Sequence, residues 1–279
     1  MEKTISLPLG NKVAYKDKYD NTLLYPIARS FARKELGITD KNLPFKGYDL
    51  WNCYEVSWLN SRGKPVVKIM SFYSPATSIN IIESKSLKLY LNSFNNTKFK
   101  TDQEVLNLIT NDLSNTAQAD IHVQLHDLSS FAHKKLTLFA GTNIDNLDVS
   151  CDEYIVNPNL LKLADTQEQD VTETITSNLL KANCLVTNQP DWATLQVNYT
   201  GLKINHQSLL QYIVSFRNHS EFHEQCVERI FNDIMQKCQP TALTVHAKFT
   251  RRGGIDINPF RSTTDPNITV INNSRDIRQ

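Results

Sequence analysis

The chain has few of the signals that mark the common nucleotide and membrane architectures. Only 8 of its 279 residues are glycine, and it contains neither a GxGxxG nor a GxxxxGK[ST] run. A bound nucleotide would therefore be held without a Rossmann turn or a P-loop. No apolar run approaches the roughly 18 residues of a membrane span, and the first residues lack the apolar centre of a signal peptide. We expect no membrane partner.

Charge and cysteine usage exclude further classes. The net charge is +1, which argues against a broad surface for nucleic acid or anionic lipid. The five cysteines are odd in number and form no CxxC pair, as expected for reduced thiols in a cytoplasmic protein. A length of 279 residues with 40% hydrophobic content allows one large domain or two of average size.

An internal repeat organises the chain. Adding 122 to the residue number carries one helical pattern onto another. The first set is Ser86, Leu87, Tyr90, Ser93, Phe94 and Asn96, and the second is Ser208, Leu209, Tyr212, Ser215, Phe216 and Asn218. The same offset places Val105 on Val227 without a gap, and it maps His223 to Thr101. We interpret this as duplication of a ββαα(ββ) unit, with modules over residues 1–137 and 138–279.

Apolar periodicity and turn residues predict the elements of each module. In the first module we expect a helix over 22–36, a hairpin of strands over 51–59 and 66–73, a helix from about Leu87, a second helix after the capping box Thr101–Glu104, and a strand over 121–128. In the second we expect strands over 173–180, 193–199, 242–249 and 255–257, with helices over 209–216 and 227–234. Residues 138–172 have no clear period and are interpreted as a connector.

One loop of the second module offers a nucleophile and an acid. Cys184 is followed by a polar turn that ends in Pro190, and Asp191 comes directly after it. A thiol becomes a useful nucleophile where its surroundings favour the thiolate, and a nearby carboxyl group can pass protons to the group under attack. Taken alone, the same residues also fit an ordinary polar loop.

A second candidate is the run Glu83-Ser84-Lys85-Ser86, which comes just before a predicted helix. The Glu83 carboxylate could accept hydrogen bonds from the N–H groups of a ligand. Lys85 could face an anion, which the helix N-terminus would help to hold. The alternative is a plain helix start, with Ser84 as the N-cap and the charges in solvent.

Two further pairs complete the candidates. His223-Glu224 opens a helix, where the glutamate could bind the paired N–H groups of a guanine-like edge and the histidine could orient or protonate a substrate. A first-turn glutamate stabilised by the helix dipole is the alternative. Arg251-Arg252-Gly253-Gly254 suits phosphate binding, since guanidinium groups match phosphate and glycine lets backbone approach a ligand. It equally suits a hairpin turn.

A zinc site is a competing reading of the same region. His219, His223 and Cys226 have the i, i+4, i+7 spacing of one helical face, and Cys184 could supply a fourth ligand. Against zinc, Cys226 lies beside an apolar stripe, where a free cysteine packs as a small hydrophobic residue.

Together these runs resemble the long, two-module form of the NADPH-dependent nitrile oxidoreductases that act on 7-cyano-7-deazaguanine, the nitrile reductases of the queuosine pathway. The matching residues are Ile82 to Lys88, the loop from Cys184 to Asp191, His223-Glu224 and Arg252-Gly253, in the same order and spacing. The resemblance implies an α+β fold of tandem tunnelling-fold modules related to GTP cyclohydrolase I, with antiparallel sheets backed by helices. It further implies a cytoplasmic homodimer that binds a small deazapurine and NADPH, with no metal, no membrane and no direct contact to nucleic acid.

The resemblance also assigns roles. Cys184 would add to the nitrile carbon to form a covalent thioimide, and Asp191 would supply a proton. Substrate would be bound by Ile82, Glu83, Ser84, His223 and Glu224. NADPH would be bound by Ser84, Lys85, Arg252 and Gly253. The competing function is a zinc-dependent cyclohydrolase on the same fold, which would use Cys184, His223 and Cys226.

Overall fold

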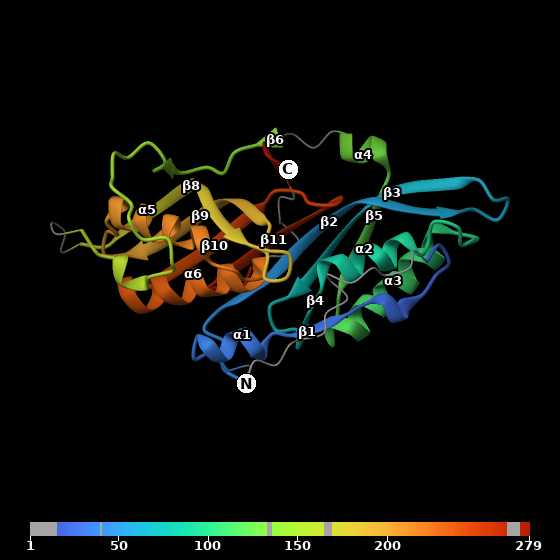
Figure 1. Cartoon of the computed structure of the whole chain (residues 1–279), viewed down its shortest axis with the longest axis horizontal. Helices are drawn as coiled ribbons and strands as arrows, with labels where there is room; N and C mark the ends of the chain where they lie inside the picture. Colours follow the sequence, from blue (N-terminus) through green and yellow to red (C-terminus); the bar gives the residue numbers. More distant parts are fainter. Residues whose placement is uncertain (1–15, 40, 133–135, 165–168, 267–273) are drawn as a thin grey trace. The chain divides into compact units, whose positions relative to one another are not determined.

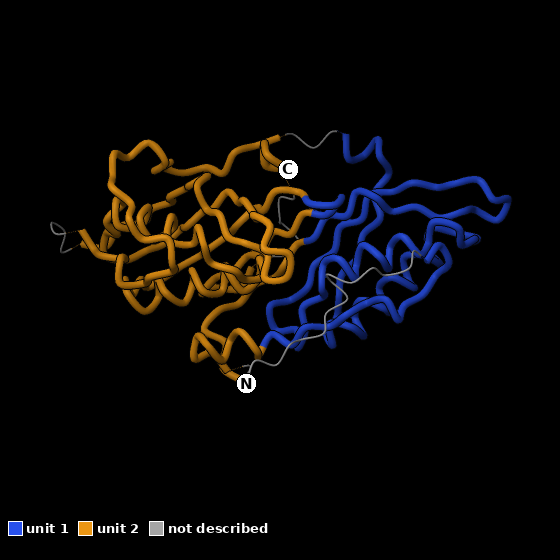
Figure 2. The backbone as a smooth tube through the Cα atoms, viewed as in Figure 1, with its two compact units in different colours: residues 1–29, 51–133, 252–255 blue, residues 30–50, 134–251, 256–279 orange. Residues whose placement is uncertain are grey.

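The structure, a computed structural model, describes residues 16–39, 41–132, 136–164, 169–266 and 274–279 (Figure 1). The chain folds into two compact units (Figure 2). The first unit consists of residues 1–29, 51–133 and 252–255, and the second of residues 30–50, 134–251 and 256–279. The predicted module boundary after residue 137 lies near the crossing at 133, but residues 30–50 and 252–255 are exchanged between the units. Among the described residues, no helix has the length and apolar character needed to cross a membrane.

The first unit combines a small antiparallel sheet with two helices. Strand β3 (Pro65–Pro75) lies between β5 (His122–His126) and the later part of β2 (Lys46–Leu59), which confirms the predicted hairpin. Helix α2 (Ser84–Asn92) is followed by α3 (Asp102–Ala117), which packs against β5 and the short strand β4 (Asn80–Ile82). The Thr101 side chain caps α3 by accepting from the Glu104 N–H at 3.1 Å, as the capping box predicts. A short helix α4 (Leu128–Ala132) follows β5.

The single helix predicted over 22–36 is wrong. The segment forms a 3₁₀ turn η1 (Asn21–Leu23), a strand β1 (Pro26–Ala28) and a short helix α1 (Ser30–Glu35). Proline lacks the N–H that a helix interior requires and disfavours helical geometry in the residue before it. In addition, β1 pairs antiparallel with β4, so that Pro26 lies opposite Ile82. A partner that is distant in sequence therefore overrides the local apolar spacing.

The second unit is built on a longer sheet. Its strand order is the first part of β2, then β11 (Ile255–Ser262), β10 (Ala242–Phe249), β9 (Pro190–Gly201), β8 (Val171–Asn183) and β7 (Thr142–Asn143). The pairs from β8 to β11 are antiparallel, and β7 joins β8 in parallel. The connector also holds a 3₁₀ turn η2 (Pro158–Leu160), and two-residue strands β6 (Leu136–Thr137) and β12 (Arg275–Asp276) pair in parallel.

Two helices complete the core of this unit. Helix α5 (His206–Ser215) contacts β8, and α6 (His223–Cys238) contacts β10; the 3₁₀ turn η3 (Phe216–Asn218) lies between the helices in sequence. Apolar side chains from helices and strands are almost fully buried, among them Leu209, Ile230, Leu195 and Val245. Each such side chain contributes roughly 1.5–3 kcal/mol by leaving water. Antiparallel strands backed by helices confirm the predicted α+β class.

The two helix pairs share contacts that support the predicted duplication. Tyr90 on α2 donates its hydroxyl hydrogen to Asp112 on α3 at 2.6 Å, and Tyr212 on α5 donates to Asp233 on α6 at 2.7 Å. Burial raises the pKa of both tyrosines, so both hydroxyls stay protonated and can donate. Each second helix ends at a left-handed glutamine, Gln118 or Gln239.

Helices α3 and α6, the second helix of each unit, are related by an offset of 121 residues and not 122. The predicted alignment without a gap is therefore wrong for this pair of helices. Helix α3 begins at Asp102 and α6 at His223, and the aspartates that accept from the tyrosines also differ by 121. His223 therefore corresponds to Asp102, not to Thr101, and Glu224 to Gln103. The tyrosine and the aspartate that it bonds are 22 residues apart in the first unit and 21 in the second, so the second unit has one residue fewer between them. The sequence does not reveal this shift of one residue, because Cys226 and Val227 are both buried and an offset of 121 or 122 fits the apolar stripe equally well.

A bulge in β8 lies just before the loop that carries Cys184. Between the pairs Ser177–Leu195 and Leu180–Ala193, β8 advances one residue more than β9. The Asp145 carboxylate fills the bulge by accepting from the Ser177 hydroxyl at 2.7 Å and from the Asn178 N–H at 3.0 Å. Because a bulge bends and twists its strand, it determines the direction in which β8 enters the Cys184 loop.

Candidate active site

Cys184 lies at the start of the loop that joins β8 to β9. The ladder pairs Ala182 with Asp191, and it continues through a hydrogen bond from the Cys184 N–H to the Gln189 carbonyl at 2.8 Å. Residues 182, 184 and 191 therefore point to the same face of the hairpin. Diagonal neighbours in such a register have Cα atoms about 7–8 Å apart, so the half-buried thiol and the carboxyl group share one face.

The Asp191 carboxylate pairs with His223 at the first residue of α6. Its Oδ2 atom is 3.2 Å from His223 Nε2, and Asp191 is only 3% exposed. The imidazole stacks on Phe249 from β10, with ring centroids 3.9 Å apart and planes 4° from parallel. His223 Nδ1 is buried and has no hydrogen-bond partner among the described residues. A buried polar atom of this kind is costly unless a further group binds it, which fits a substrate contact.

Glu224 follows His223 and is buried, with 2% of its surface exposed. It lies in the first turn of α6, where the N-cap residue Phe222 makes no side-chain capping bond. A buried glutamate in the first turn is still stabilised by the helix dipole, so its burial fits both readings and substrate binding by Glu224 stays a prediction.

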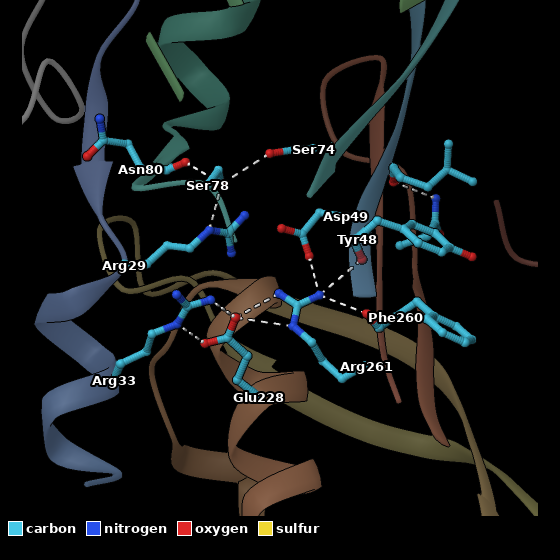
Figure 3. A network of polar contacts seen from close by, with 12 residues as sticks. Arg29, Arg33, Tyr48, Asp49, Ser74, Ser78, Asn80, Glu228, Phe260 and Arg261 are labelled. Atoms are coloured by element: carbon cyan, nitrogen blue, oxygen red, sulfur yellow. Dashed lines mark hydrogen bonds and ion pairs between the residues drawn. The ribbon is translucent and has the colours of Figure 1, made fainter. Parts of the chain in front are cut away.

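One turn further along α6, a buried ion network holds the helix (Figure 3). Glu228 accepts from Arg33 of α1 at 2.9 and 2.8 Å and from Arg261 of β11 at 3.1 and 2.8 Å. Arg261 also pairs with Asp49 at 2.8 Å. Burial acts to lower the pKa of Arg261, but the carboxylates of Asp49 and Glu228 outweigh it and raise the pKa. The network therefore stays charged, and it fixes the start of α6 through Glu228.

Glu83 in the first unit caps α2. Its two carboxylate oxygens accept from the N–H groups of Lys85 at 2.9 Å and Ser86 at 2.7 Å. The predicted alternative, with Ser84 as N-cap, is therefore wrong, and so is the idea that these helix N–H groups are available to an anion. Burial raises the pKa of Glu83, although the two backbone bonds act against the rise. Each carboxylate oxygen has a second lone pair, so capacity for a ligand remains.

The turn after β10 lies beside basic groups of α2. An added Cβ on Gly253 would come within 2.9 Å of Lys88 Nζ, and Gly253 has a φ of +58°. Lys88 and Gly253 line a small cavity together with Gly254 and Glu55, whose carboxylate is 3.7 Å from Lys88 Nζ. The Lys88 cation therefore lies over backbone without a side chain, with a carboxylate beside it, and the binding of NADPH by Gly253 stays a prediction.

The residues of the proposed zinc set do not come together in the structure. His219 precedes α6 and does not extend its helical face, and its Nε2 atom is 2.9 Å from Glu221. His223 Nε2 is directed at Asp191, and Cys226 is fully buried. Burial raises the pKa of the Cys226 thiol well above its usual range, which disfavours the thiolate that zinc requires. No three His, Cys, Asp or Glu side chains within the described ranges could hold a metal ion.

The predicted residues thus fall into two groups. Within the second unit, Cys184, Asp191, His223 and Glu224 come from one hairpin and the start of one helix. Within the first unit, Ile82 ends β4, Ser84 and Lys85 open α2, and Arg252 and Gly253 form the turn. Sequence reasoning missed Phe249 under His223 and the network around Glu228, because neither belongs to a local motif.

The chain is similar to known proteins along nearly its whole length. A family model described as nitrile reductase, 7-cyano-7-deazaguanine-reductase N-terminal, matches residues 15–125, and one described as QueF-like protein matches residues 190–268. The NADPH-dependent 7-cyano-7-deazaguanine reductase of Dechloromonas aromatica (strain RCB) is 54% identical over 272 residues, which cover 98% of this chain and 95% of that protein. The protein of the same name from Cupriavidus pinatubonensis (strain JMP 134 / LMG 1197) is 52% identical over 273 residues, 98% of each chain.

One solved structure, of an apo archaeosine synthase QueF-Like, aligns with 36% of this chain and 100% of its own at 14% identity and a TM-score of 0.31. Two family models cover the larger part of the sequence, and two relatives align along nearly its whole length. The chain therefore belongs to the family of 7-cyano-7-deazaguanine nitrile reductases.

Proposed function

We propose that this chain reduces the nitrile of 7-cyano-7-deazaguanine to the primary amine of 7-aminomethyl-7-deazaguanine, with NADPH as reductant, in queuosine biosynthesis. Two relatives that bear this activity in their names align with nearly the whole chain. The structural observation that supports it most directly is the shared hairpin face of Cys184 and Asp191, with Asp191 paired to His223.

Cys184 is the proposed nucleophile. Its thiolate adds to the electrophilic nitrile carbon, a carbon–sulfur bond forms, and the nitrile nitrogen takes a proton to give a thioimide. Asp191 lies on the same hairpin face and is the proposed source of that proton. Bound NADPH would supply the two hydrides that the carbon needs, and one further proton on nitrogen completes the conversion of nitrile to amine. Between the reductions the thiolate leaves, which restores Cys184.

Two glutamates and the buried histidine nitrogen are the proposed substrate contacts. Glu83 and Glu224 are each 2% exposed, and carboxylates in such surroundings bind strongly to paired N–H groups, which a deazaguanine presents. His223 Nδ1 is a buried ring nitrogen that finds no partner among the described residues, so a substrate group can serve as one. Ile82 and Ser84 flank Glu83 and complete the proposed set.

Ser84, Lys85, Arg252 and Gly253 are the proposed residues for NADPH. Lys85 and Arg252 bring positive charge, and Gly253 has no side chain, so the Lys88 ammonium group lies against its backbone. A dinucleotide bound in this way needs no Rossmann turn.

The activity is tested with the purified protein, 7-cyano-7-deazaguanine and NADPH. We expect the near-ultraviolet absorbance of NADPH to fall by two equivalents for each amine formed, with the product identified by its mass. A nitrile hydrolase would instead leave NADPH unchanged and yield an amide or acid, and that outcome would overturn the proposal.

Replacing Asp191 with asparagine is expected to lower kcat by about 10²–10⁴-fold, the usual contribution of a general acid. Asparagine has nearly the same shape and can still bond to His223, but it has no acidic proton to deliver. Steady-state kinetics checks this, with Asp148→Asn as an exposed control that keeps full activity. If kcat of the Asp191→Asn protein is unchanged, Asp191 is not the source of the proton.

The assembly and location of the protein also belong to the proposal. We infer a cytoplasmic homodimer that binds the free deazapurine and neither nucleic acid nor membrane. All five cysteines are free in the structure, in agreement with a reducing compartment. Light scattering on the purified chain measures the number of copies in the assembly.

A further inference from the structure

The segment between η3 and α6 holds the loop of the nucleophile. The Asn183 N–H donates to the His219 carbonyl at 2.7 Å, and the Glu221 N–H donates to the Asn183 carbonyl at 3.1 Å. These bonds form a parallel bridge between Asn183 and Ser220, directly before Cys184. Residues 219–221 form a strap across the base of the loop.

The strap also contacts the other side of the loop. The Ser220 hydroxyl donates to the Asn188 side-chain oxygen at 3.3 Å. Asn188 has a φ of +56°, in the left-handed region, and its N–H donates to the Cys184 carbonyl at 2.9 Å. The loop is therefore closed on itself and held by the strap at both of its ends.

Glu221 fastens the strap to α6. Its carboxylate accepts from Arg229 Nε at 3.0 Å and from Arg229 Nη2 at 2.9 Å, and it lies 2.9 Å from His219 Nε2. The side chain is only 5% exposed. Burial acts to raise the pKa of Glu221, but the bonds from His219 and Arg229 outweigh it, so the carboxylate stays charged.

We propose that Glu221 is a positioning residue for the nucleophile: through the strap, it sets the place of Cys184 relative to the helix that carries His223 and Glu224. The inference rests on the proposed function, in which Cys184 must meet a substrate bound by α6. Glu221 itself need not touch the substrate. An error of about 1 Å in such an arrangement can cost about 10²-fold in rate, which is the effect expected when the strap loosens.

The test is Glu221→Gln, which keeps the size of the side chain and removes the charge held by Arg229. The enzyme is mixed with 7-cyano-7-deazaguanine without NADPH, and the covalent adduct on the Cys184 peptide is followed over time by mass spectrometry. We expect adduct formation to be about 100-fold slower than in the wild type, with the KM for NADPH unchanged. Arg229→Lys retains the positive charge but cannot make both hydrogen bonds to Glu221. Its rate of adduct formation is expected to lie between those of the wild type and Glu221→Gln.

Glu173→Gln is the matched control. Glu173 also pairs with a histidine, His206 at 3.1 Å, and accepts from the Tyr199 hydroxyl at 2.7 Å, but it lies near the opposite end of β8. We expect this variant to form the adduct at the wild-type rate even if its melting temperature falls. A purely structural role for Glu221 predicts the same behaviour for Glu221→Gln, and that result would overturn the inference.

Ser220→Ala keeps the inference testable if Glu221→Gln does not fold. It removes only the hydroxyl contact with Asn188, so adduct formation is expected to slow about fivefold, the equivalent of one hydrogen bond, with the melting temperature unchanged. A wild-type rate in Ser220→Ala would then overturn the inference. Failure of the wild-type enzyme itself to form an adduct on Cys184 would instead refute the proposed function.

Discussion

Cys184→Ala is expected to lose turnover while it still binds 7-cyano-7-deazaguanine. Removing the nucleophile of a covalent mechanism lowers kcat on the order of 10⁴- to 10⁶-fold, because the remaining groups cannot replace the bond that it forms. Substrate binding should persist, since Glu83, His223 and Glu224 are the proposed contacts. Intact-protein mass spectrometry should show the adduct in the wild type and none in the variant, and calorimetry should show binding in both.

Cys151→Ala is the control for this experiment. Cys151 is another half-buried free thiol of the same unit, in the connector before β8. Its replacement is expected to leave both the adduct and the rate unchanged. A Cys184→Ala enzyme within about tenfold of the wild-type rate, or an adduct that maps to another cysteine, would contradict the thioimide mechanism.

Much of the local structure follows from the sequence, because it depends on patterns of short range. The hairpin of β2 and β3 and the helices α2, α3, α5 and α6 all carry a regular apolar period, and the structure contains each of them. Thr101 and Glu104 mark the start of α3 for the same reason, since a cap involves neighbours in the chain. Cys184 and Asp191 could be linked because both lie at the base of one hairpin loop.

What the sequence could not provide is set by contacts between distant residues. The pairing of Pro26 with Ile82 converts part of a predicted helix into β1. Asp191 meets His223, and Phe249 lies under the imidazole, only because β9, β10 and α6 are packed together. No rule of sequence spacing links these positions. The sequence therefore identified Asp191 and His223 as candidate site residues but did not predict the contact between them.

Glu228→Ala is expected to lower the free energy of unfolding by about 3–5 kcal/mol, the cost of breaking a buried ion pair by removing one partner. Glu228, Arg33 and Arg261 are each about 1% exposed or less. Without the carboxylate, Arg33 loses both of its bonds to Glu228. Arg261 retains Asp49, so the loss falls mainly on the contact between α1 and α6. Urea unfolding followed by circular dichroism measures the change.

Two variants separate the cost of the buried charges from loss of side-chain volume. Glu228→Gln keeps the shape and can accept from one guanidinium, so it should be destabilised nearly as much as Glu228→Ala if charge pairing dominates. Arg33→Met together with Glu228→Met removes a charge of each sign and fills the space, and should recover much of the stability. Glu153→Ala, an exposed carboxylate of the same unit, should stay within about 0.5 kcal/mol of the wild type. A Glu228→Ala protein as stable as the Glu153→Ala control would show that the network does not anchor α6, and would leave the position of His223 and Glu224 to be explained by apolar packing alone.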